Sequence, residues 1–314
     1  MKPGTLVISL DFELVWGIFD HIILKDKVTY FDNTLNVIPQ MLELFEQNRI
    51  EVTWATVGML FNENWEQWRH NQPEQQPTYH NKKLDAYAYG LTHEKAGLDR
   101  FFFAPKLIKQ LINTPGQELA THTYSHYYCL EPGQTREQFA ADLNKVIEVA
   151  HNVKSQPRSL VFPRNQWNPE YLSLCAERGI TQLRSNPDTW FWNPAKNTLA
   201  HKIARTGDAY MPLHKMSYSE VESTPIGVTA QPASRFLRQQ QKGKLFNNLR
   251  LQRIRNEMTL AARYGEIYHL WWHPHNFGNY PEASLITLKI ILNHFQTLRE
   301  TYGMTSKTMG SFAG

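Results

Sequence analysis

The sequence predicts a single domain of the α/β class, built on a parallel sheet. Its 314 residues are enough for one large α/β domain, and a composition of 41% hydrophobic and 20% charged residues is typical of a globular enzyme. Short β-branched and Leu-rich runs alternate with stretches in which apolar residues recur every three or four positions. Strands separated by helices pair in parallel through right-handed crossovers, so this alternation favours a sheet covered by helices.

The predicted elements follow this alternation along the whole chain. Strands are expected over 5–10, 50–58, 118–120, 159–163, 180–185 and 266–272. Helices are expected over 34–48, 105–113, 135–150, 169–178 and 283–302. Gly179 marks the end of the fourth helix, because glycine commonly caps a helix C-terminus. We find no internal repeat, low-complexity tract or linker, and we therefore expect one domain over residues 1–314.

Two stretches interrupt the regular pattern and are expected to be insertions, at about 62–104 and 193–256. The first is rich in Asn, Gln, Trp, Tyr and Pro. A long irregular stretch between regular elements is more often functional than idle, and it is interpreted as a lid or wall over an active-site mouth. The alternative is an insertion that only faces solvent.

Charge and hydropathy narrow the classes of partner. A net charge of +4 is too small to indicate nucleic acid, and no recognised nucleic-acid motif is present. No apolar run is long enough to span a bilayer, no secretory signal is visible and only two cysteines occur, so a cytoplasmic location is expected. Residues 223–256 hold seven Lys or Arg and no acid, which indicates a solvated face or a contact with a diphosphate or an anionic membrane surface.

Two histidines form the first candidate site. His122 and His126 are four residues apart, a spacing that would place both imidazoles on one face of a helical turn, where they could bind one metal ion. A pair of polar or core histidines with no shared role is the alternative, since such spacing also arises by chance.

Two carboxylates end the first predicted strand. Asp11 and Glu13 are two residues apart, so in an extended chain they project to the same side while Phe12 points away. Chemistry in α/β folds is concentrated at the carboxyl ends of the strands, which makes this pair a candidate site. A salt-bridged or helix-capping acidic pair is the alternative.

The order of these and three later motifs resembles the polysaccharide deacetylases, the NodB-homology family of carbohydrate esterases (family four). The resemblance covers roughly residues 5–303. The matching motifs are, in chain order, Asp11-Phe12-Glu13, His122-Thr123-Tyr124-Ser125-His126, Pro163-Arg164, Asp188 with Trp190, and His273 or His275. Two motifs depart from the family pattern, because Phe12 separates the two acids, which are usually adjacent, and Pro163 precedes Arg164 instead of following it.

The resemblance implies an irregular (β/α) barrel of about seven strands and the hydrolysis of an N-acetyl group, or less commonly an O-acetyl group, on a sugar. It implies a divalent metal, zinc first, with cobalt, nickel or iron as other choices. Glu13, His122 and His126 are the implied ligands, although Asp11 could take the place of Glu13.

The other implied roles concern proton transfer and substrate. Asp11 is the implied general base, Arg164 its orienting partner, His273 the general acid and Asp188 the residue that orients this histidine. His273 is favoured over His275 because it follows the strand directly. Substrate contacts are expected from Trp190, His275, Tyr124 and Asn165, with a backbone N–H near Tyr124 or Asn165 available for the oxyanion.

Three further expectations concern substrate and alternatives. A carbohydrate that is nucleotide-linked or lipid-linked, used in bacterial surface-polysaccharide assembly, fits a location inside the cell, with the basic segment 235–255 beside its phosphates and contact with the membrane surface. One rival function is another metal-dependent carbohydrate or amide hydrolase on the same barrel. The other is a non-catalytic sugar-binding protein whose metal site is lost at Phe12.

Overall fold

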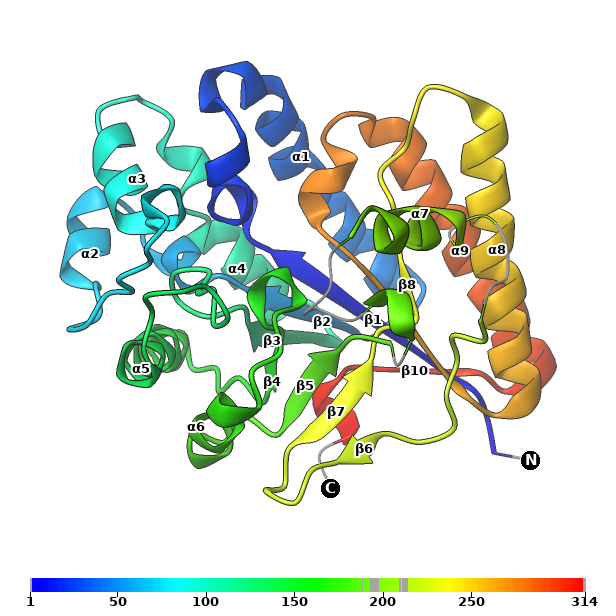
Figure 1. Ribbon diagram of the computed structural model, residues 1–314. Coiled ribbons are helices and arrows are strands. Elements are labelled where there is room, and N and C mark those ends of the chain that lie inside the picture. Colours follow the sequence, from blue (N-terminus) through cyan, green and yellow to red (C-terminus); the bar gives the residue numbers. More distant parts are fainter. Residues whose placement is uncertain (1, 188, 193–197, 209, 211–213, 313–314) are drawn as a thin grey trace.

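A curled sheet surrounded by helices forms the centre of the molecule (Figure 1). The computed structural model describes residues 2–187, 189–192, 198–208, 210 and 214–312. The strand order is β6-β7-β5-β4-β3-β2-β1-β9-β8, with β10 beside β1, and among the paired strands of the described residues only β6 and β7 are antiparallel. The strands are β1 (Thr5–Phe12), β2 (Val52–Thr56), β3 (Gln117–Thr121), β4 (Ser159–Leu160), β5 (Gln182–Ser185), β6 (Glu222–Ser223), β7 (Thr229–Pro232), β8 (Arg235–Phe236), β9 (Ile267–Trp272) and β10 (Thr305–Lys307).

Residues 229–236 join the two ends of the curled sheet. Their first part, β7, pairs with β5, and their last part, β8, pairs with β9. Between the two, the Ala233 N–H donates to the Ser185 carbonyl (2.9 Å) and the Ser234 N–H donates to the His269 carbonyl (2.8 Å). This continuous stretch therefore acts as one strand of the barrel. The other barrel strands are β1, β2, β3, β4, β5 and β9. The predicted irregular (β/α)7-type barrel and the single domain are therefore confirmed.

The second predicted insertion, 193–256, is too long. The barrel strand at 229–236 lies inside it, and so does the first half of helix α8 (Lys244–Tyr264). The strand was missed because β8 is only two residues long and contains Arg235, whereas a buried strand is normally recognised by an apolar run. The Arg235 guanidinium is buried against the carboxylates of Asp208 and Glu257, and these opposite charges offset the cost of burying an arginine in the strand.

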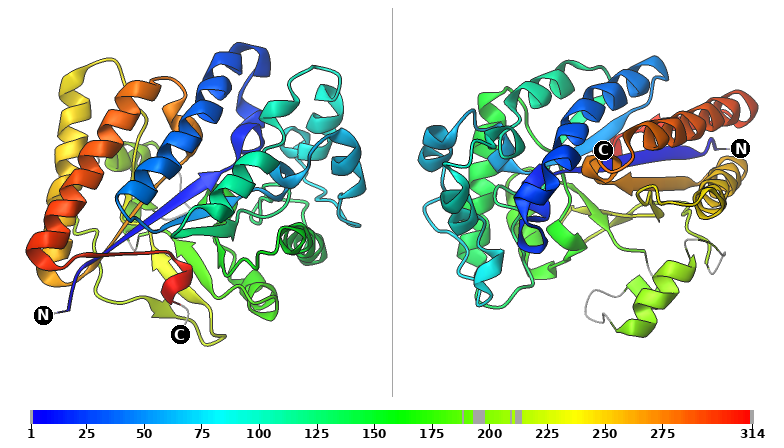
Figure 2. Two further views of the ribbon diagram at one scale, coloured as in Figure 1. Left: turned by 180° about the vertical axis from the view of Figure 1, so that it is seen from behind. Right: turned by 90° about the horizontal axis from the view of Figure 1, so that it is seen from above.

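Helices cover the barrel on the outside. In Figure 2, α8, α9, α1 and α4 lie beside one another across the back of the sheet, in agreement with the contacts between neighbouring helices, and α7 projects from the body in the view from above. Among the described residues, no helix combines the length and apolar character that crossing a bilayer requires. The remaining helices are α1 (Val28–Gln47), α2 (Trp65–His70), α3 (Ala86–His93), α4 (Pro105–Asn113), α5 (Arg136–Asn152), α6 (Leu172–Glu177), α7 (Leu199–Asp208) and α9 (Pro281–Tyr302).

The first irregular stretch, 62–104, is a packed aromatic structure that contains α2 and α3. Trp65 and Trp68 are buried, and the Trp68 ring stacks on Trp16 with their centroids 6.3 Å apart. The Trp16 indole N–H donates to the Phe102 carbonyl (2.8 Å), which ties the stretch to the turn that follows β1. Because Trp16 lies three residues after Glu13, this stretch supports the segment that carries the acidic pair.

Candidate active site at the carboxyl ends of the strands

Asp11 and Glu13 lie together at the carboxyl end of β1. Asp11 belongs to the strand, Glu13 begins the 3-10 turn η1 (Leu14–Gly17), and both residues are 2% exposed. The His273 Nε2 lies 3.6 Å from Asp11 Oδ2 and 3.7 Å from Glu13 Oε1. The two carboxylates therefore face a common space, as the alternation of strand side chains predicts.

Glu13, His122 and His126 form a compact cluster of possible metal ligands. Glu13 Oε2 lies 3.3 Å from His122 Nε2 and 3.1 Å from His126 Nε2. One ligand atom from each residue lies within 4.8 Å of the others, and all three residues are buried. A carboxylate with two imidazoles is a recurrent set of catalytic zinc ligands, and it also suits other first-row metals.

The orientation of the two imidazoles fits metal binding. The His122 Nδ1 lies 2.7 Å from the Val161 carbonyl, which fixes a proton on Nδ1 and leaves the lone pair on Nε2. That Nε2 is buried and makes no hydrogen bond, although it faces Glu13. The His126 Nδ1 in turn lies 3.1 Å from the Tyr128 hydroxyl. A buried imidazole nitrogen without a hydrogen bond, aimed at a carboxylate, is what a ligand of a divalent ion requires.

The histidine pair does not lie on a helix, so that part of the prediction is wrong. β3 ends at Thr121, and the loop that follows has left-handed backbone at Thr123 (φ 63°) and His126 (φ 57°). These two conformations, and not a helical repeat, turn both rings toward Glu13.

A buried carboxylate from α5 holds this loop. Asp142 accepts hydrogen bonds from the Tyr124 N–H (2.6 Å), the Ser125 N–H (3.0 Å) and the Ser125 hydroxyl. Burial raises the pKa of Asp142 to about 6, although these donors act to lower it. The loop geometry thus depends on one side chain that lies sixteen residues beyond His126.

Gly17 leaves the room that Glu13 occupies. A Cβ at Gly17 would lie 1.9 Å from the Glu13 Cδ and 2.1 Å from Oε1, far inside van der Waals contact. The carboxylate end of Glu13 therefore packs directly over the Gly17 backbone. Any larger residue at position 17 would displace this carboxylate from the two histidines.

Asp11 is paired with Arg184 of β5. The Arg184 Nη1 and Nη2 donate to Asp11 Oδ1 and Oδ2, each at 2.7 Å, and both side chains are buried. The guanidinium also lies over the Trp271 ring, 4.1 Å from its centroid. Ser9 extends the network, since its hydroxyl lies 3.1 Å from Arg184 Nη1 and 2.8 Å from His269 Nε2. This bidentate pair fixes the carboxylate in both position and charge.

Arg164 does not make the contact that was predicted for it, and this assignment is corrected. Its Nη2 donates to Asp20, and its guanidinium lies over the Tyr128 ring, 4.3 Å from the centroid. Arg164 has left-handed backbone (φ 56°) in the turn after β4, and Asp11 is already engaged by Arg184. Arg164 is therefore part of the rim and does not orient Asp11.

The two late histidines both face the acidic pair. The turn η10 (Pro274–Phe277) brings His275 back, so that its ring stacks on His273 with centroids 4.9 Å apart. The His275 Nδ1 is buried, lies 3.6 Å from Glu13 Oε1 and has no hydrogen-bond partner in the described part of the chain. The His273 side chain is 24% exposed and reaches both carboxylates. Access to solvent distinguishes His273 as the ring that a substrate can reach.

Two of the residues expected to contact substrate, Tyr124 and Asn165, are not placed as predicted. The Tyr124 side chain is fully buried, and its N–H is taken by Asp142. The Asn165 N–H donates to the Phe162 carbonyl (2.9 Å), so neither of these amides is free for an oxyanion. The Asn165 side chain instead accepts from Arg184 Nη2 (2.9 Å), which makes it a support for the Asp11 pair.

The fourth motif contributes little to the described site. Trp190 is 59% exposed, and its ring contacts Phe191 and His201, with centroids 5.5 and 5.3 Å away. Asp188 lies outside the described residues, so its expected role with His273 stays a prediction.

Burial and neighbouring charges set the protonation of the cluster. Burial alone would raise the pKa of Glu13, but the neighbouring His273 and His126 hold it well below its usual range. Burial likewise opposes ionisation of Asp11, and Arg184 outweighs it, so the pKa of Asp11 is lowered. Burial lowers the pKa of His275 to about 3. Both carboxylates are therefore ionised and His275 is neutral at neutral pH.

Sequence reasoning missed Arg184, Asp142 and Gly17. A signal existed for Arg184, because an arginine in the buried strand 180–185 requires a carboxylate partner near the strand end. Nothing in the local sequence distinguishes Asp142 from an exposed helical residue, or Gly17 from a turn glycine. Their roles appear only when the loop after β3 and the turn after β1 are brought together.

The fold and this cluster define a class: α/β-barrel proteins with an acidic pair, a histidine pair and a further histidine at the carboxyl ends of the strands. A family model described as polysaccharide deacetylase matches residues 25–183, just over half of the chain. The chain belongs to the polysaccharide deacetylase family. The matched stretch contains both histidines of the cluster, whereas Asp11, Glu13, Arg184 and His273 lie outside it.

Solved structures agree with the fold. A protein from Mycobacterium smegmatis described as a polysaccharide deacetylase is 14% identical, with a TM-score of 0.62 over 99% of this chain and 89% of that one. A second one so described, from Pseudomonas aeruginosa PAO1, is 11% identical, with a TM-score of 0.56 over 93% and 85%. Puue allantoinase is 12% identical, with a TM-score of 0.58 over 98% and 89%. At these identities the likeness concerns the fold alone. No curated protein matches the sequence.

Proposed function

We propose that this protein is a metal-dependent hydrolase that removes an N-acetyl group, or as a second choice an O-acetyl group, from a sugar or sugar conjugate. The observation that carries the proposal is the buried Glu13–His122–His126 cluster beside the ionised Asp11 carboxylate. Membership of the polysaccharide deacetylase family supports the same chemistry.

Glu13, His122 and His126 would hold the metal ion. When bound, a divalent ion supplies a Lewis acid that activates water and polarises the acyl carbonyl. Zinc is the proposed metal because it favours one carboxylate and two imidazoles in catalytic sites, and cobalt, nickel and iron also accept this set. The lone pair of His122 Nε2 is available to a metal ion, because this atom makes no hydrogen bond within the described residues.

Asp11 and His273 would move the protons. The Asp11 carboxylate accepts a proton from the attacking water as general base, and Arg184 keeps it ionised and aimed through two hydrogen bonds. His273 donates a proton to the departing amine, since it is the partly exposed imidazole next to both carboxylates. Arg184 thus takes the positioning role first expected of Arg164.

The decisive experiment measures metal content by elemental analysis for wild type and Glu13→Ala in parallel, and then acetate release from small N-acetyl sugars. We expect about one metal ion per chain in the wild type, loss of it in the variant, and acetate release only from the wild type. Asp11→Asn is the matched control, because it should keep the metal and lose the activity.

The other outcomes separate the rival functions. Bound metal with no acetate release from any N-acetyl or O-acetyl sugar would favour a different hydrolase on the same barrel. No metal in the wild type, even after reconstitution with zinc, would sink the hydrolase proposal and favour a sugar-binding protein.

A further inference from the structure

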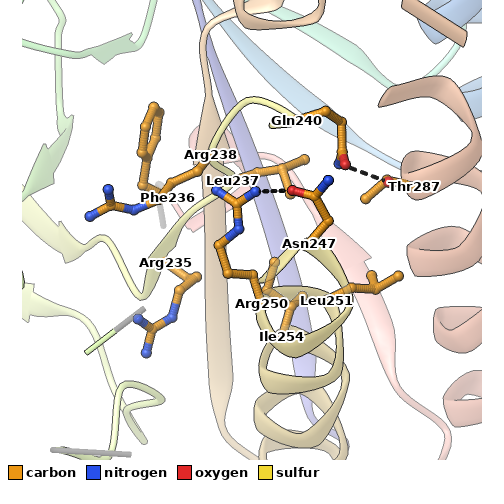
Figure 3. Close-up of a pocket in the computed structure, with 10 residues that line it drawn as sticks. All are labelled: Arg235, Phe236, Leu237, Arg238, Gln240, Asn247, Arg250, Leu251, Ile254 and Thr287. Atoms are coloured by element: carbon orange, nitrogen blue, oxygen red, sulfur yellow. Dashed lines mark hydrogen bonds between the residues drawn. The ribbon is translucent and has the colours of Figure 1, made fainter. Parts of the chain in front are cut away.

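A small cavity lies between the segment that follows β8, the first turns of α8 and the helix α9 (Figure 3). Its polar lining comes mainly from Arg238, Gln240, Asn247 and Arg250, and its volume is about 20 Å³. That space holds about one water molecule or one oxygen atom of a larger ligand. Arg238 and Gln240 are partly exposed, so the cavity reaches the surface.

Arg250 contributes a buried guanidinium that lacks a full set of partners. The residue is 7% exposed. Its Nη2 donates to the Asn247 side-chain oxygen and to the Gln239 carbonyl (3.3 Å). Its Nη1 is buried and has no hydrogen-bond partner among the described residues. Figure 3 places this guanidinium at the centre of the lining residues, beside Asn247.

The other buried arginines in the described part of the chain all face a carboxylate, and Arg250 does not. Its two acceptors are a neutral amide and a neutral carbonyl. A buried charge without a counter-charge is costly, so this position favours an external anion. The paired arginines are Arg184 with Asp11, Arg235 with Asp208 and Glu257, and Arg253 with Glu257.

The start of α8 adds a second favourable feature. The helix begins at Lys244, its N-cap Gly243 offers no side-chain cap, and its first turn contains no acidic residue. The free N–H groups and the dipole of such a helix end attract anions. Asn247 belongs to this first turn and lines the cavity, so the helix end and the Arg250 guanidinium act on the same space.

The cavity borders the candidate active site. Phe236 lines the cavity, and its ring centroid lies 5.6 Å from that of His273. The Gln239 side chain accepts from the Asn279 side chain (3.1 Å), just after the turn that carries His275. One layer of side chains thus separates the cavity from the general acid proposed above.

We propose that this cavity binds a phosphoryl oxygen of a phosphorylated sugar substrate, with Arg250 and the α8 N-terminus as its anion-binding groups. The substrate class is a sugar linked through a phosphate or diphosphate, and the group attached beyond the phosphate, which the reaction leaves in place, is either a nucleoside or a polyprenyl lipid. The assignment of this ligand as substrate rests on the proposed deacetylase function, whereas the anion site itself does not.

The first test is calorimetric titration of inorganic pyrophosphate into the full-length protein. Wild type should bind pyrophosphate, and Arg250→Met should weaken the affinity by roughly tenfold to a hundredfold, the range expected for a lost charged hydrogen bond. Arg263→Met, which removes the same charge from an exposed position on α8, is the control and should stay within about twofold. Equal binding by all three proteins, or none by the wild type, overturns the proposal.

A second variant keeps the test valid if Arg250→Met fails to fold. Asn247→Asp places a carboxylate on the atom that already contacts Arg250, so it supplies the missing counter-charge from within the protein. It should raise the melting temperature and abolish pyrophosphate binding. Undiminished binding by a folded Asn247→Asp protein contradicts the proposal.

The final comparison identifies the source of the phosphate and separates the two proposals. Glu13→Ala should bind pyrophosphate like the wild type, which excludes binding at the metal cluster.

Tighter binding of uridine diphosphate than of pyrophosphate indicates a nucleotide-linked sugar. Preference for phosphatidylcholine vesicles containing a polyprenyl phosphate over plain vesicles indicates a lipid-linked one. If neither exceeds pyrophosphate, the substrate assignment fails, while acetate release from unphosphorylated N-acetyl sugars still tests the deacetylase function.

Discussion

Arg184 and Asp11 form a bidentate ion pair at the base of the candidate active site, with both hydrogen bonds 2.7 Å long and both side chains buried. The two residues come from β5 and β1, which are not neighbours in the sheet. The pair therefore spans the interior of the barrel. It also explains how a buried carboxylate stays ionised and available as a base, because the guanidinium offsets the cost of burial.

Replacement of Arg184 should shift the pH dependence of the reaction. Arg184→Met removes the group that lowers the pKa of Asp11, so burial will raise this pKa and the acidic limb of kcat/KM will move to higher pH. Arg184→Lys keeps a charge and should restore part of the shift. Arg164→Met is the comparison, since its guanidinium faces Asp20, and it should leave the limb where it is. If the acidic limb of kcat/KM shifted in Arg164→Met and not in Arg184→Met, Arg164 would be the residue that positions Asp11.

Gly17→Ala should damage metal binding more than folding. The new Cβ would meet the Glu13 carboxylate at about 2 Å, and rotation of that flexible side chain away from His122 and His126 relieves the clash. We expect metal affinity to fall by about 10–100-fold, the usual cost of disturbing a ligand's orientation. Competition with a chelator measures this affinity.

A matched control for Gly17→Ala exists in α7. Gly207→Ala adds the same methyl group where no atom of the described residues lies within 4 Å, so metal affinity should be unchanged. Wild-type affinity in Gly17→Ala would show that Glu13 is not a metal ligand.

The sequence predicted the chemistry of the site better than its geometry. The acidic pair, the histidine pair and His273 were identified from residue type, spacing and position after strands, and the structure brings all of them together. These signals are local, because a strand end and a two-residue or four-residue spacing can be seen in one stretch of chain.

Contacts between distant segments could not be predicted in this way. Arg164 and Arg184 each follow or end a short strand, and only the curvature of the sheet decides that Arg184 reaches Asp11. The helical turn expected for His122 was replaced by left-handed backbone at Thr123, which a tertiary contact with Asp142 stabilises. The barrel strand at 229–236 was missed because it carries polar and basic residues whose partners lie far away in sequence.

Charge reversal at two arginines of α8 should have two different effects on stability. Arg253 is buried against Glu257 and Asp208, so Arg253→Glu places a third carboxylate in this cluster. We expect a loss of about 3–5 kcal/mol in the free energy of unfolding, measured with urea. Arg263→Glu makes the same charge change at an exposed position and should cost less than about 0.5 kcal/mol. A similar small loss in both variants would show that the buried cluster is not required for folding.

Asp142 should make the stability of the metal-free protein fall as pH rises from about 4 to about 6. Its pKa is raised from 3.8 to about 6 by burial, so the folded protein holds this proton over a range in which the unfolded chain has lost it. A folded state that binds more protons loses stability with rising pH. The shift of about two pKa units corresponds to about 3 kcal/mol, lost by pH 6 and above.

Asp142→Asn isolates this contribution, because asparagine does not titrate. The variant should be less stable than the wild type at pH 4. Asp142 accepts hydrogen bonds from the Tyr124 and Ser125 N–H groups, whereas the NH2 group of asparagine would face one of these N–H groups and cannot accept from it. As the wild type loses stability toward pH 6, the difference between the two proteins should shrink. Urea unfolding at half-unit steps of pH measures it for both proteins without metal. A difference that instead grows between pH 4 and pH 6 would mean that the hydrogen bonds from the loop outweigh burial and that Asp142 is ionised throughout this range.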